Sequence, residues 1–299
     1  MYLFLRKAKI LAITYCKAIL GNLYSYLPYI DKYYKARYES EILAKIRTST
    51  FIVSPKQTLT EVENAILNNR VGCYLRFGDG DIFLASNRDD MFQKSSEKLK
   101  NEMHEALLLK GENVFKCLTI HSELFGYEKE MFLGNHKTSN EQSLELLKIA
   151  FPYFVGHKIY SPVALHFEAT YDATRANTFL KNLKARTKLF IGNEDTPPEV
   201  SKHLFGNAHH IKTPPRNAFD AINDVERETT KVLDYMTEYC VVCVAMGCSG
   251  RPLAKRLFIR NYNIFLFDFG SLLDGICGYH TRTWMNVVNI DYSTLLAGL

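Results

Sequence analysis

The sequence lacks several features that would each point to a class of protein. It contains no uncharged apolar run long enough to span a bilayer, no low-complexity tract and no internal repeat. The apolar stretches near the start are interrupted by Arg6, Lys7 and Lys9, and no small-residue cleavage site follows, so no secretory signal is expected. A complete G-x-G-x-x-G fingerprint and the lysine of a P-loop are also missing, which argues against a dinucleotide-binding or ATP-hydrolysing domain.

What is present is the composition of an ordinary globular protein. The 299 residues are 47% hydrophobic and 23% charged, enough to bury a sizeable core. Of the seven cysteines, Cys73, Cys117, Cys240 and Cys243 stand in apolar, strand-like runs, which is typical of buried, reduced thiols in a cytoplasmic protein. Valines surround Cys240 and Cys243, so their C-x-x-C spacing favours a strand over a zinc site or a redox turn.

The net charge of +5 is concentrated at the N-terminus. Residues 1–37 hold seven basic residues against one acid, Asp31, an excess of six, so the remainder of the chain sums to minus one. Proteins that bind nucleic acid carry clustered lysine and arginine on the binding face. The main body is therefore not expected to bind nucleic acid.

Residues 1–50 are predicted to form a helical arm, and residues 51–299 the main domain. In the first thirty residues, apolar side chains such as Leu3, Ile10 and Leu23 are interleaved with basic residues and tyrosines. This pattern is typical of an interfacial helix that makes peripheral contact with the inner membrane face through residues 1–37. It is equally typical of a helix that packs on the domain with its basic side in solvent. The expected localisation is cytoplasmic in both cases.

Short apolar, β-prone segments alternate with helical patterns along the main domain. A helix over 57–70 opens with the capping-box pattern Thr58-Leu59-Thr60-Glu61, and a short apolar run over 71–75 follows it. Strands separated by helices of ten or more residues imply parallel pairing, so the sequence predicts an α/β, Rossmann-like fold with a mostly parallel sheet and helices on both faces. Further strands are expected near 114–120, 157–160, 188–192, 210–212, 240–246 and 264–267, and further helices near 95–110, 123–132, 139–150, 171–184, 198–205, 218–238 and 250–261.

The first candidate site is the turn that follows the apolar run over 71–75. It reads Arg76-Phe77-Gly78-Asp79-Gly80-Asp81, and the carboxyl end of a strand is where ligands bind in open α/β sheets. Asp79 and Asp81 offer hard oxygen ligands for a divalent cation that bridges a diphosphate, and Arg76 is placed to reach a phosphate or to hold a carboxylate. Gly78 and Gly80 allow a ligand to approach the backbone. The alternative is that Asp79 caps the next helix and Asp81 lies in its first turn.

The second candidate site is the small-residue loop over 247–250. Gly247, Ser249 and Gly250 lie between the most apolar strand and a helix, where free backbone amides and the helix dipole favour a phosphate. The alternative is a tight turn with no ligand. Asn217 and Asp268 follow other expected strands, as do residues 193–195, and polar loops at strand ends converge in such folds.

The histidines are weaker candidates. His166 and Glu168 are expected to share a strand face, whereas the adjacent His209 and His210 would point to opposite faces of an extended chain. Surface or packing roles are favoured over catalysis for all of them.

The order of these motifs resembles the GT-D type glycosyltransferases over roughly residues 55–285. The turn over 76–81 is similar to the R-F-G-D-G-E signature of that family, with Asp81 in place of glutamate, and Ser271 stands where the family would have a histidine after Gly270. The resemblance implies a Rossmann-like fold, a divalent metal (Mn²⁺ or Mg²⁺) held through the D-x-E motif, and transfer of a hexose from a UDP-sugar to a glycan. The match also extends through Gly192-Asn193, Asn217-Ala218-Phe219, Gly247 to Gly250 with Leu253-Ala254, and Asp268-Phe269-Gly270.

The sequence therefore predicts a metal-dependent glycosyltransferase of polysaccharide or glycoconjugate assembly. Its partners would be a nucleotide-sugar donor and a glycan, glycoprotein or lipid-linked acceptor. Asp79 and Asp81 are the predicted catalytic and metal-binding residues. The predicted nucleotide-binding residues are Arg76, Gly78, Gly80, Asn217, Gly247, Ser249, Gly250 and Asp268. Two alternatives remain, a Rossmann-type methyltransferase using S-adenosylmethionine and a non-catalytic nucleotide-binding module of a glycan assembly complex.

Overall fold

The computed structural model describes residues 37, 40–119, 146, 148–286 and 288–299. The chain divides into two compact units, Met1–Thr48 and Ser49–Leu299. Residues 40–48 of the first unit are helical. Almost all of the predicted arm lies outside the described residues, as do the helix expected near 123–132 and most of that near 139–150. In the described part of the chain, no helix is long and apolar enough to cross a membrane.

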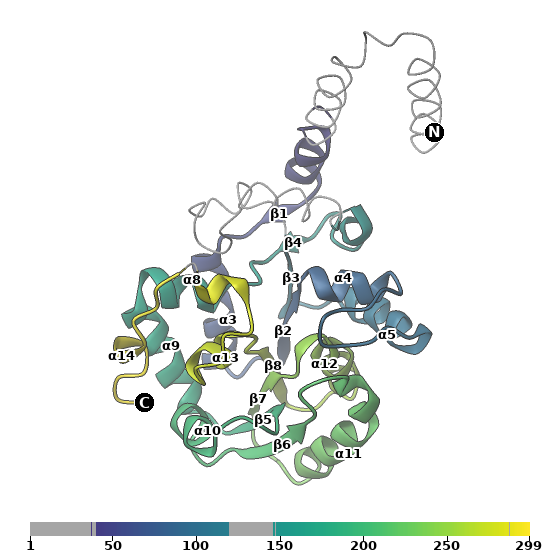
Figure 1. Ribbon diagram of the computed structural model, residues 1–299. Coiled ribbons are helices and arrows are strands. Elements are labelled where there is room, and N and C mark those ends of the chain that lie inside the picture. Colours follow the sequence, from purple (N-terminus) through teal and green to yellow (C-terminus); the bar gives the residue numbers. More distant parts are fainter. Residues whose placement is uncertain (1–36, 38–39, 120–145, 147, 287) are drawn as a thin grey trace, which may run out of the picture. The chain divides into compact units, whose positions relative to one another are not determined.

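The second unit is built on a six-stranded parallel sheet in the order β3-β2-β8-β7-β5-β6 (Figure 1). Strands β7 and β8 lie at its centre and are almost entirely buried, which explains their unbroken apolar sequences. Strand β6 lies at the edge and alternates between exposed and buried residues. The strands are β2 (Gly72–Phe77), β3 (Val114–Leu118), β5 (Lys188–Asn193), β6 (His209–Thr213), β7 (Cys240–Ala245) and β8 (Ile264–Asp268), and β1 (Phe51–Ile52) pairs separately with β4 (Lys158–Ile159).

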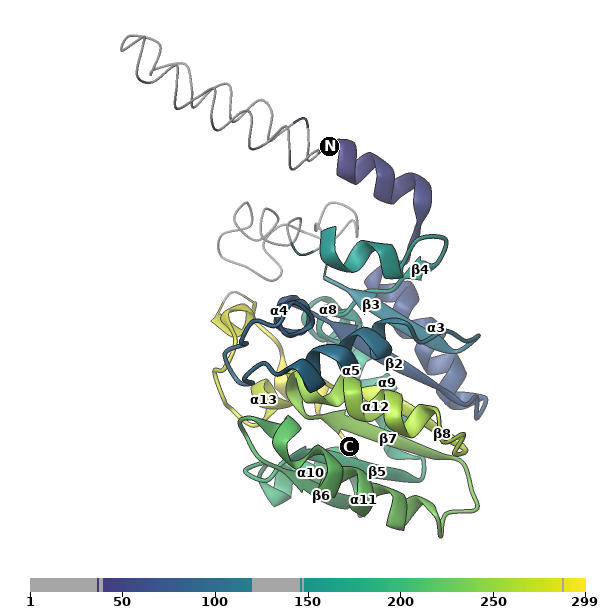
Figure 2. The same cartoon turned by 90° about the vertical axis from the view of Figure 1, so that its right-hand side faces the viewer.

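Helices cover both faces of the sheet (Figures 1 and 2). On one face lie α4 (Asp79–Ala85), α5 (Glu97–Leu107), α11 (Ile222–Leu233) and α12 (Gly250–Phe258), and on the other lie α3 (Pro55–Leu67), α8 (Ala164–Tyr171), α9 (Ala173–Lys184), α10 (Pro198–Phe205), α13 (Leu272–Ile276) and α14 (Tyr292–Leu295). The short 3₁₀ segments are η2 (Phe151–Tyr153), η3 (Ala218–Ala221), η4 (Gly247–Ser249) and η5 (Thr283–Asn286). This architecture confirms the predicted α/β fold with a parallel sheet.

The order of the strands places the candidate loops together. The chain runs outward from β2 to β3, later fills the other edge with β5 and β6, and finally returns through β7 and β8 to the middle. The loops that follow β2, β8 and β7 therefore leave neighbouring strands at the same edge of the sheet. Such a change of direction in the strand order is where α/β folds bind ligands.

The helix predicted over 57–70 begins earlier than the capping box indicates. Ser54 is the N-cap of α3 and accepts a hydrogen bond from the Gln57 amide, with Pro55 in the first helical position. The hydroxyl of Thr58 is buried and accepts a hydrogen bond from the Ser161 amide at 3.1 Å. The prediction was wrong at this point because Thr58 joins the helix to a distant segment, whereas a cap would have used its hydroxyl locally.

The expectation that His166 and Glu168 share a strand face is also wrong. Both residues lie in α8, where positions two apart point in widely different directions around the helix axis. The helix predicted over 171–184 corresponds to α9, and α8 precedes it as a helix that was not predicted.

Candidate active site

The turn after β2 orients its two carboxylates differently. Gly78 is the N-cap of α4, and its amide donates to Oδ2 of Asp81 at 2.8 Å. The Asp81 side chain is buried, with the residue only 2% exposed. Asp79 is exposed, and its Oδ1 accepts the amide of Gly80 at 2.9 Å. The predicted pair therefore consists of one carboxylate that faces inward and one that faces solvent.

The inward carboxylate meets a buried arginine that was not among the predicted site residues. Arg251, in the first turn of α12, places Nε 3.2 Å from Oδ1 of Asp81 and Nη1 3.1 Å from Oδ2 of Asp268. Its guanidinium also donates to the carbonyl oxygens of Arg76 (2.6 Å) and Gly247 (2.5 Å). A single cation thus bridges carboxylates from the ends of β2 and β8 and contacts the loop after β7.

Asp268 lies between two arginines. Its Oδ1 is 3.8 Å from Nη1 of Arg76, whose Nε donates to the carbonyl oxygen of Pro162. Gly270 is required beside this arginine: its φ is +63°, and a Cβ there would lie 1.2 Å from Nη1 of Arg76. Arg76 was predicted to reach a phosphate or to hold one of the carboxylates of its own turn, but the carboxylate that it approaches is that of Asp268.

Burial and charge oppose one another within this cluster. Burial raises the pKa of Asp81 to about 6, although the charge of Arg251 and the hydrogen bond from Gly78 favour the ionised form. Burial also disfavours the charge of Arg251, but Asp268 and Asp81 outweigh it and raise the pKa of the guanidinium. Oδ1 of Asp81 and Oδ2 of Asp268 are buried and accept no hydrogen bond from another described residue, although both lie at ion-pair distance from Arg251. The cluster therefore keeps two carboxylate oxygens with unused lone pairs.

The three predicted residues of the loop over 247–250 differ in their surroundings. Gly247 has a φ of +55°, and no atom lies within 4 Å of the position that a Cβ would take. Ser249 is buried, and its hydroxyl donates to Oε1 of Gln93 at 2.9 Å. A Cβ on Gly250 would lie 3.0 Å from Cγ1 of Val244. Among these predicted residues, Gly247 is the one that faces open space.

Gln93, which was not among the predicted site residues, connects three loops of the site. Besides Ser249, its Oε1 accepts the amide of Phe219 at 3.0 Å. Asn217, in the left-handed conformation with a φ of 52°, accepts the amide of Lys94 on its side-chain oxygen at 2.9 Å. The predicted residues Asn217 and Ser249 therefore both hold the segment over 93–94 in place.

A buried histidine reaches the position after Gly270. Nε2 of His166 lies 3.4 Å from Oγ of Ser271, which also accepts a hydrogen bond from Nε1 of Trp284 at 3.0 Å. Ser271 replaces the histidine that the family resemblance would place there. In this protein an imidazole approaches the same point from α8.

Comparison with known proteins identifies the fold and the family. The protein-family model described as glycosyltransferase GT-D fold matches residues 74–275 of the chain. The chain belongs to this family. The match covers the turn after β2, the loop after β7 and the end of β8, so all ten predicted site residues lie within it. No curated protein matches the chain.

Solved structures similar to this GT-D glycosyltransferase support the same fold. A selenomethionine-substituted structure of domain of unknown function 1792 is 19% identical, with 78% of this chain and 82% of that chain covered and a TM-score of 0.61. A structure described as a new glycosyltransferase (DUF1792) from Streptococcus sanguinis is 17% identical, with 82% and 92% covered and a TM-score of 0.58. The family match confirms the predicted family and glycosyltransferase class, and the solved structures confirm the fold.

The donor set of this GT-D site fits a hard cation that takes part of its coordination from a substrate. In the part of the chain that the structure describes, no group of three His, Cys, Asp or Glu side chains is placed to hold a metal ion. Mg²⁺-type ions are commonly held by one or two carboxylates, with the remaining ligands supplied by substrate phosphates and water. Asp79, open to solvent, and the unused Oδ1 of Asp81 are carboxylate oxygens of this kind.

Because His166 is buried, we expect the free energy of unfolding of the enzyme to fall as the pH is lowered. Burial, together with the nearby charge of Arg76, lowers the pKa of this imidazole well below its ordinary value. Unfolded histidine takes up a proton near pH 6.5, so below that pH the unfolded chain binds one more proton and folding stability falls. The free energy of unfolding should fall by up to about 1.4 kcal/mol for each pH unit.

We expect His166→Gln to reduce this slope between pH 6.5 and 5, measured by urea unfolding at several pH values. His209→Gln, which changes an exposed histidine on β6, should keep the wild-type slope. Equal slopes in the wild type and His166→Gln would contradict the assignment.

Proposed function

We propose that this GT-D enzyme transfers a hexose from a UDP-sugar to a glycan acceptor with the help of a divalent cation. The observation that carries the proposal is the pair of buried carboxylates with Arg251 between them, Asp81 in the first turn of the helix after β2 and Asp268 at the end of the neighbouring strand β8. The exposed carboxylate of Asp79 lies in the same turn as Asp81. Glycan, glycoprotein and lipid-linked acceptors all fit this chemistry.

The chain's own residues would divide the work between orientation and charge. Gly78 and Arg251 hold Asp81 in one direction, so the site is largely organised before the donor arrives. Mn²⁺ or Mg²⁺, held by Asp79 and Asp81, would neutralise the charge that develops on the leaving diphosphate. The open space at Gly247 and the start of α12 would receive the diphosphate itself.

The reaction exchanges one bond at the anomeric carbon for another. The acceptor hydroxyl oxygen bonds to that carbon while the bond to the diphosphate oxygen breaks. The diphosphate leaves with the electron pair, and the hydroxyl proton passes to a base or to water.

A panel of nucleotide sugars tests this proposal. The full chain is incubated with UDP-, GDP-, TDP- and ADP-hexoses, each with Mn²⁺, Mg²⁺ or EDTA, and release of the nucleoside diphosphate is followed. We expect turnover with a UDP-hexose and at least a 10-fold lower rate in EDTA. Titration calorimetry that shows equal UDP affinity in EDTA and in Mn²⁺ would contradict the role of the cation.

A further inference from the structure

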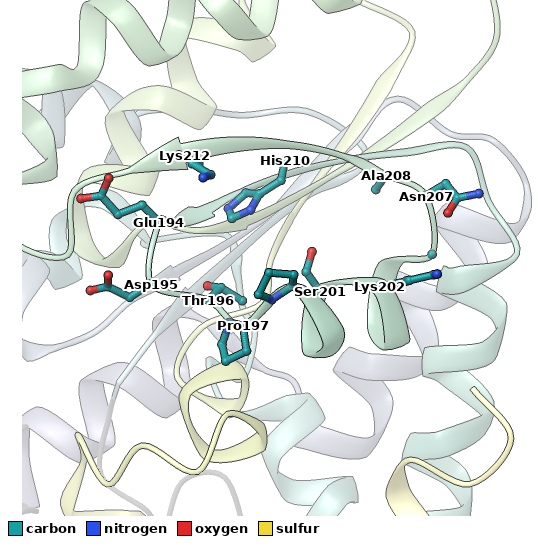
Figure 3. A pocket seen from close by; sticks show the side chains of 12 residues that line it. Glu194, Asp195, Thr196, Pro197, Ser201, Lys202, Asn207, Ala208, His210 and Lys212 are labelled. Atoms are coloured by element: carbon teal, nitrogen blue, oxygen red, sulfur yellow. The ribbon is translucent and has the colours of Figure 1, made fainter.

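A cavity opens between α10 and β6 (Figure 3). Its volume is about 500 Å³, within the range of small-molecule binding sites. It begins at the loop after β5, with Glu194 and Asp195, and extends along α10 toward Lys202 and Asn207. Glu194 and Asp195 belong to the polar loop over 193–195 that the sequence places among the converging strand ends, whereas none of the ten predicted catalytic and nucleotide-binding residues lines this cavity.

The cavity is lined by charged groups that have not paired with one another. Among the described residues, no hydrogen bond or ion pair involves the ammonium groups of Lys202 and Lys212 or the carboxylate of Glu194. Figure 3 shows the carboxylates of Glu194 and Asp195 at one end and Lys202 at the other. Lys212 lies on the same side of the view as the two carboxylates, so a ligand would meet carboxylates and one ammonium group at one end and the ammonium group of Lys202 at the other.

Hydroxyl groups line the middle of the cavity. Thr196 and Ser201 are 6% and 9% exposed, and no hydrogen bond of either hydroxyl is formed with another described residue. The Ser201 side chain points into the space between α10 and β6 (Figure 3). Neither hydroxyl oxygen is among the buried atoms that lack a partner, so both are accessible and free to hydrogen-bond to a ligand that carries donors and acceptors of its own.

The start of helix α10 and the aromatic content of the lining argue against a nucleotide in this cavity. The N-cap and the first residue of α10 are Pro197 and Pro198, which have no amide hydrogens, so this helix start offers a diphosphate fewer donors than most. The single aromatic ring in the lining is the imidazole of His210, which already stacks on Phe190 with centroids 4.5 Å apart. The lining instead combines carboxylates, hydroxyls and ammonium groups with the apolar proline rings, a set that suits a saccharide.

The cavity reaches the same side of the sheet as the residues of the proposed reaction. Its acidic end lies at the carboxyl end of β5, on the edge of the sheet where Asp81 and Asp268 lie. The hydroxyl of Tyr279, in the segment that follows α13, donates to the carbonyl oxygen of Asp195 at 2.9 Å. We propose that this cavity binds the saccharide acceptor, with Glu194, Asp195 and Ser201 contacting its hydroxyls; the inference rests on the proposed transferase function.

Saturation-transfer NMR tests the binding without any donor. The probes are glucose, galactose, N-acetylglucosamine, cellobiose and lactose, each at millimolar concentration with the full chain. We expect signals from at least one of them, reduced at least fivefold in Ser201→Leu, which fills the cavity, and in Glu194→Gln, which removes the charge. Glu199→Gln, an exposed change on the same helix outside the cavity, is the matched control and should keep the signals.

Separate readouts distinguish failure of this inference from failure of the proposed function. Each variant is checked by its melting temperature and by calorimetric titration with UDP and Mn²⁺. Saccharide signals that persist in Ser201→Leu, or that are absent from the wild type with all five probes, overturn the acceptor site. Loss of UDP binding in a folded Ser201→Leu variant would assign the cavity to the donor and also overturn it. Absence of donor turnover in the wild type would reject the transferase proposal, and the NMR result would still report on the cavity.

Discussion

Replacing Asp81 with asparagine is expected to lower the transfer rate by about 100-fold or more while the chain stays folded. An asparagine side-chain oxygen can still accept the amide of Gly78, so the start of α4 should be preserved. What disappears is the negative charge that faces Arg251 at 3.2 Å and that would help to hold the cation. The change therefore separates the charge of Asp81 from its capping role, which Asp81→Ala would remove together with the charge.

The measurement is the initial rate of nucleoside diphosphate release from the UDP-hexose that the wild type uses, in saturating Mn²⁺. Asp79→Asn is measured in parallel and should raise the Mn²⁺ concentration needed for half-maximal rate, because Asp79 is the carboxylate open to solvent. Glu112→Gln is the control. Glu112 is exposed and lies just before β3, at the amino ends of the strands, whereas the site lies at their carboxyl ends. A folded Asp81→Asn variant with more than a tenth of the wild-type rate would remove Asp81 from the proposed chemistry.

The sheet was predictable because its central strands have unambiguous sequences. The runs that form β7 and β8 are apolar throughout, as burial on both faces requires, and the predicted boundaries differ from the observed ones by one residue. The region around α8 was not predictable in the same way. Its sequence over 164–171 is short, and nearly all of it is buried or partly buried, so neither a helical nor a strand period marks it.

Part of the candidate site could be located from sequence because strand ends converge in a parallel sheet. The turn after β2, the loop after β7 and the end of β8 were each predicted from local residues, and the structure joins them through Arg251. The directions of the two carboxylates could not be predicted, because Asp79 and Asp81 look alike in sequence. In the structure, the hydrogen bond from Gly78 and the ion pair with Arg251 distinguish Asp81.

Arg251 itself carried a signal that sequence reasoning can use. A cation in the first turn of a helix is unfavourable, because the partial charge at that end of the helix is positive. An arginine directly after a glycine-rich loop at the start of an apolar helix therefore indicates carboxylates nearby. Gln93 carried no comparable signal, since a glutamine in a polar loop is ordinarily exposed.

Replacing Arg251 with methionine is expected to reduce the free energy of unfolding by about 3–5 kcal/mol, because it leaves two buried carboxylates without their shared cation. Methionine retains much of the length and apolar volume of the arginine stem, so the loss should reflect charge and hydrogen bonds more than packing. The guanidinium also donates to the carbonyl oxygens of Arg76 and Gly247, and methionine cannot replace these bonds.

Urea unfolding of Arg251→Met, Asp268→Asn and the double variant measures how the charges depend on one another. If the cost of Arg251→Met arises from uncompensated carboxylates, Asp268→Asn should remove part of it, and the double variant should be at least 1 kcal/mol more stable than additivity predicts, within the usual range for residues in contact. Arg260→Met is the matched control: this arginine follows α12, is half exposed and pairs with Glu226, so its loss should cost no more than about 1 kcal/mol. A loss in Arg251→Met as small as that of Arg260→Met, or strict additivity in the double variant, would show that the carboxylates are stabilised without Arg251. Asp81 and Asp268 would then have to share a proton or take up a cation in its place.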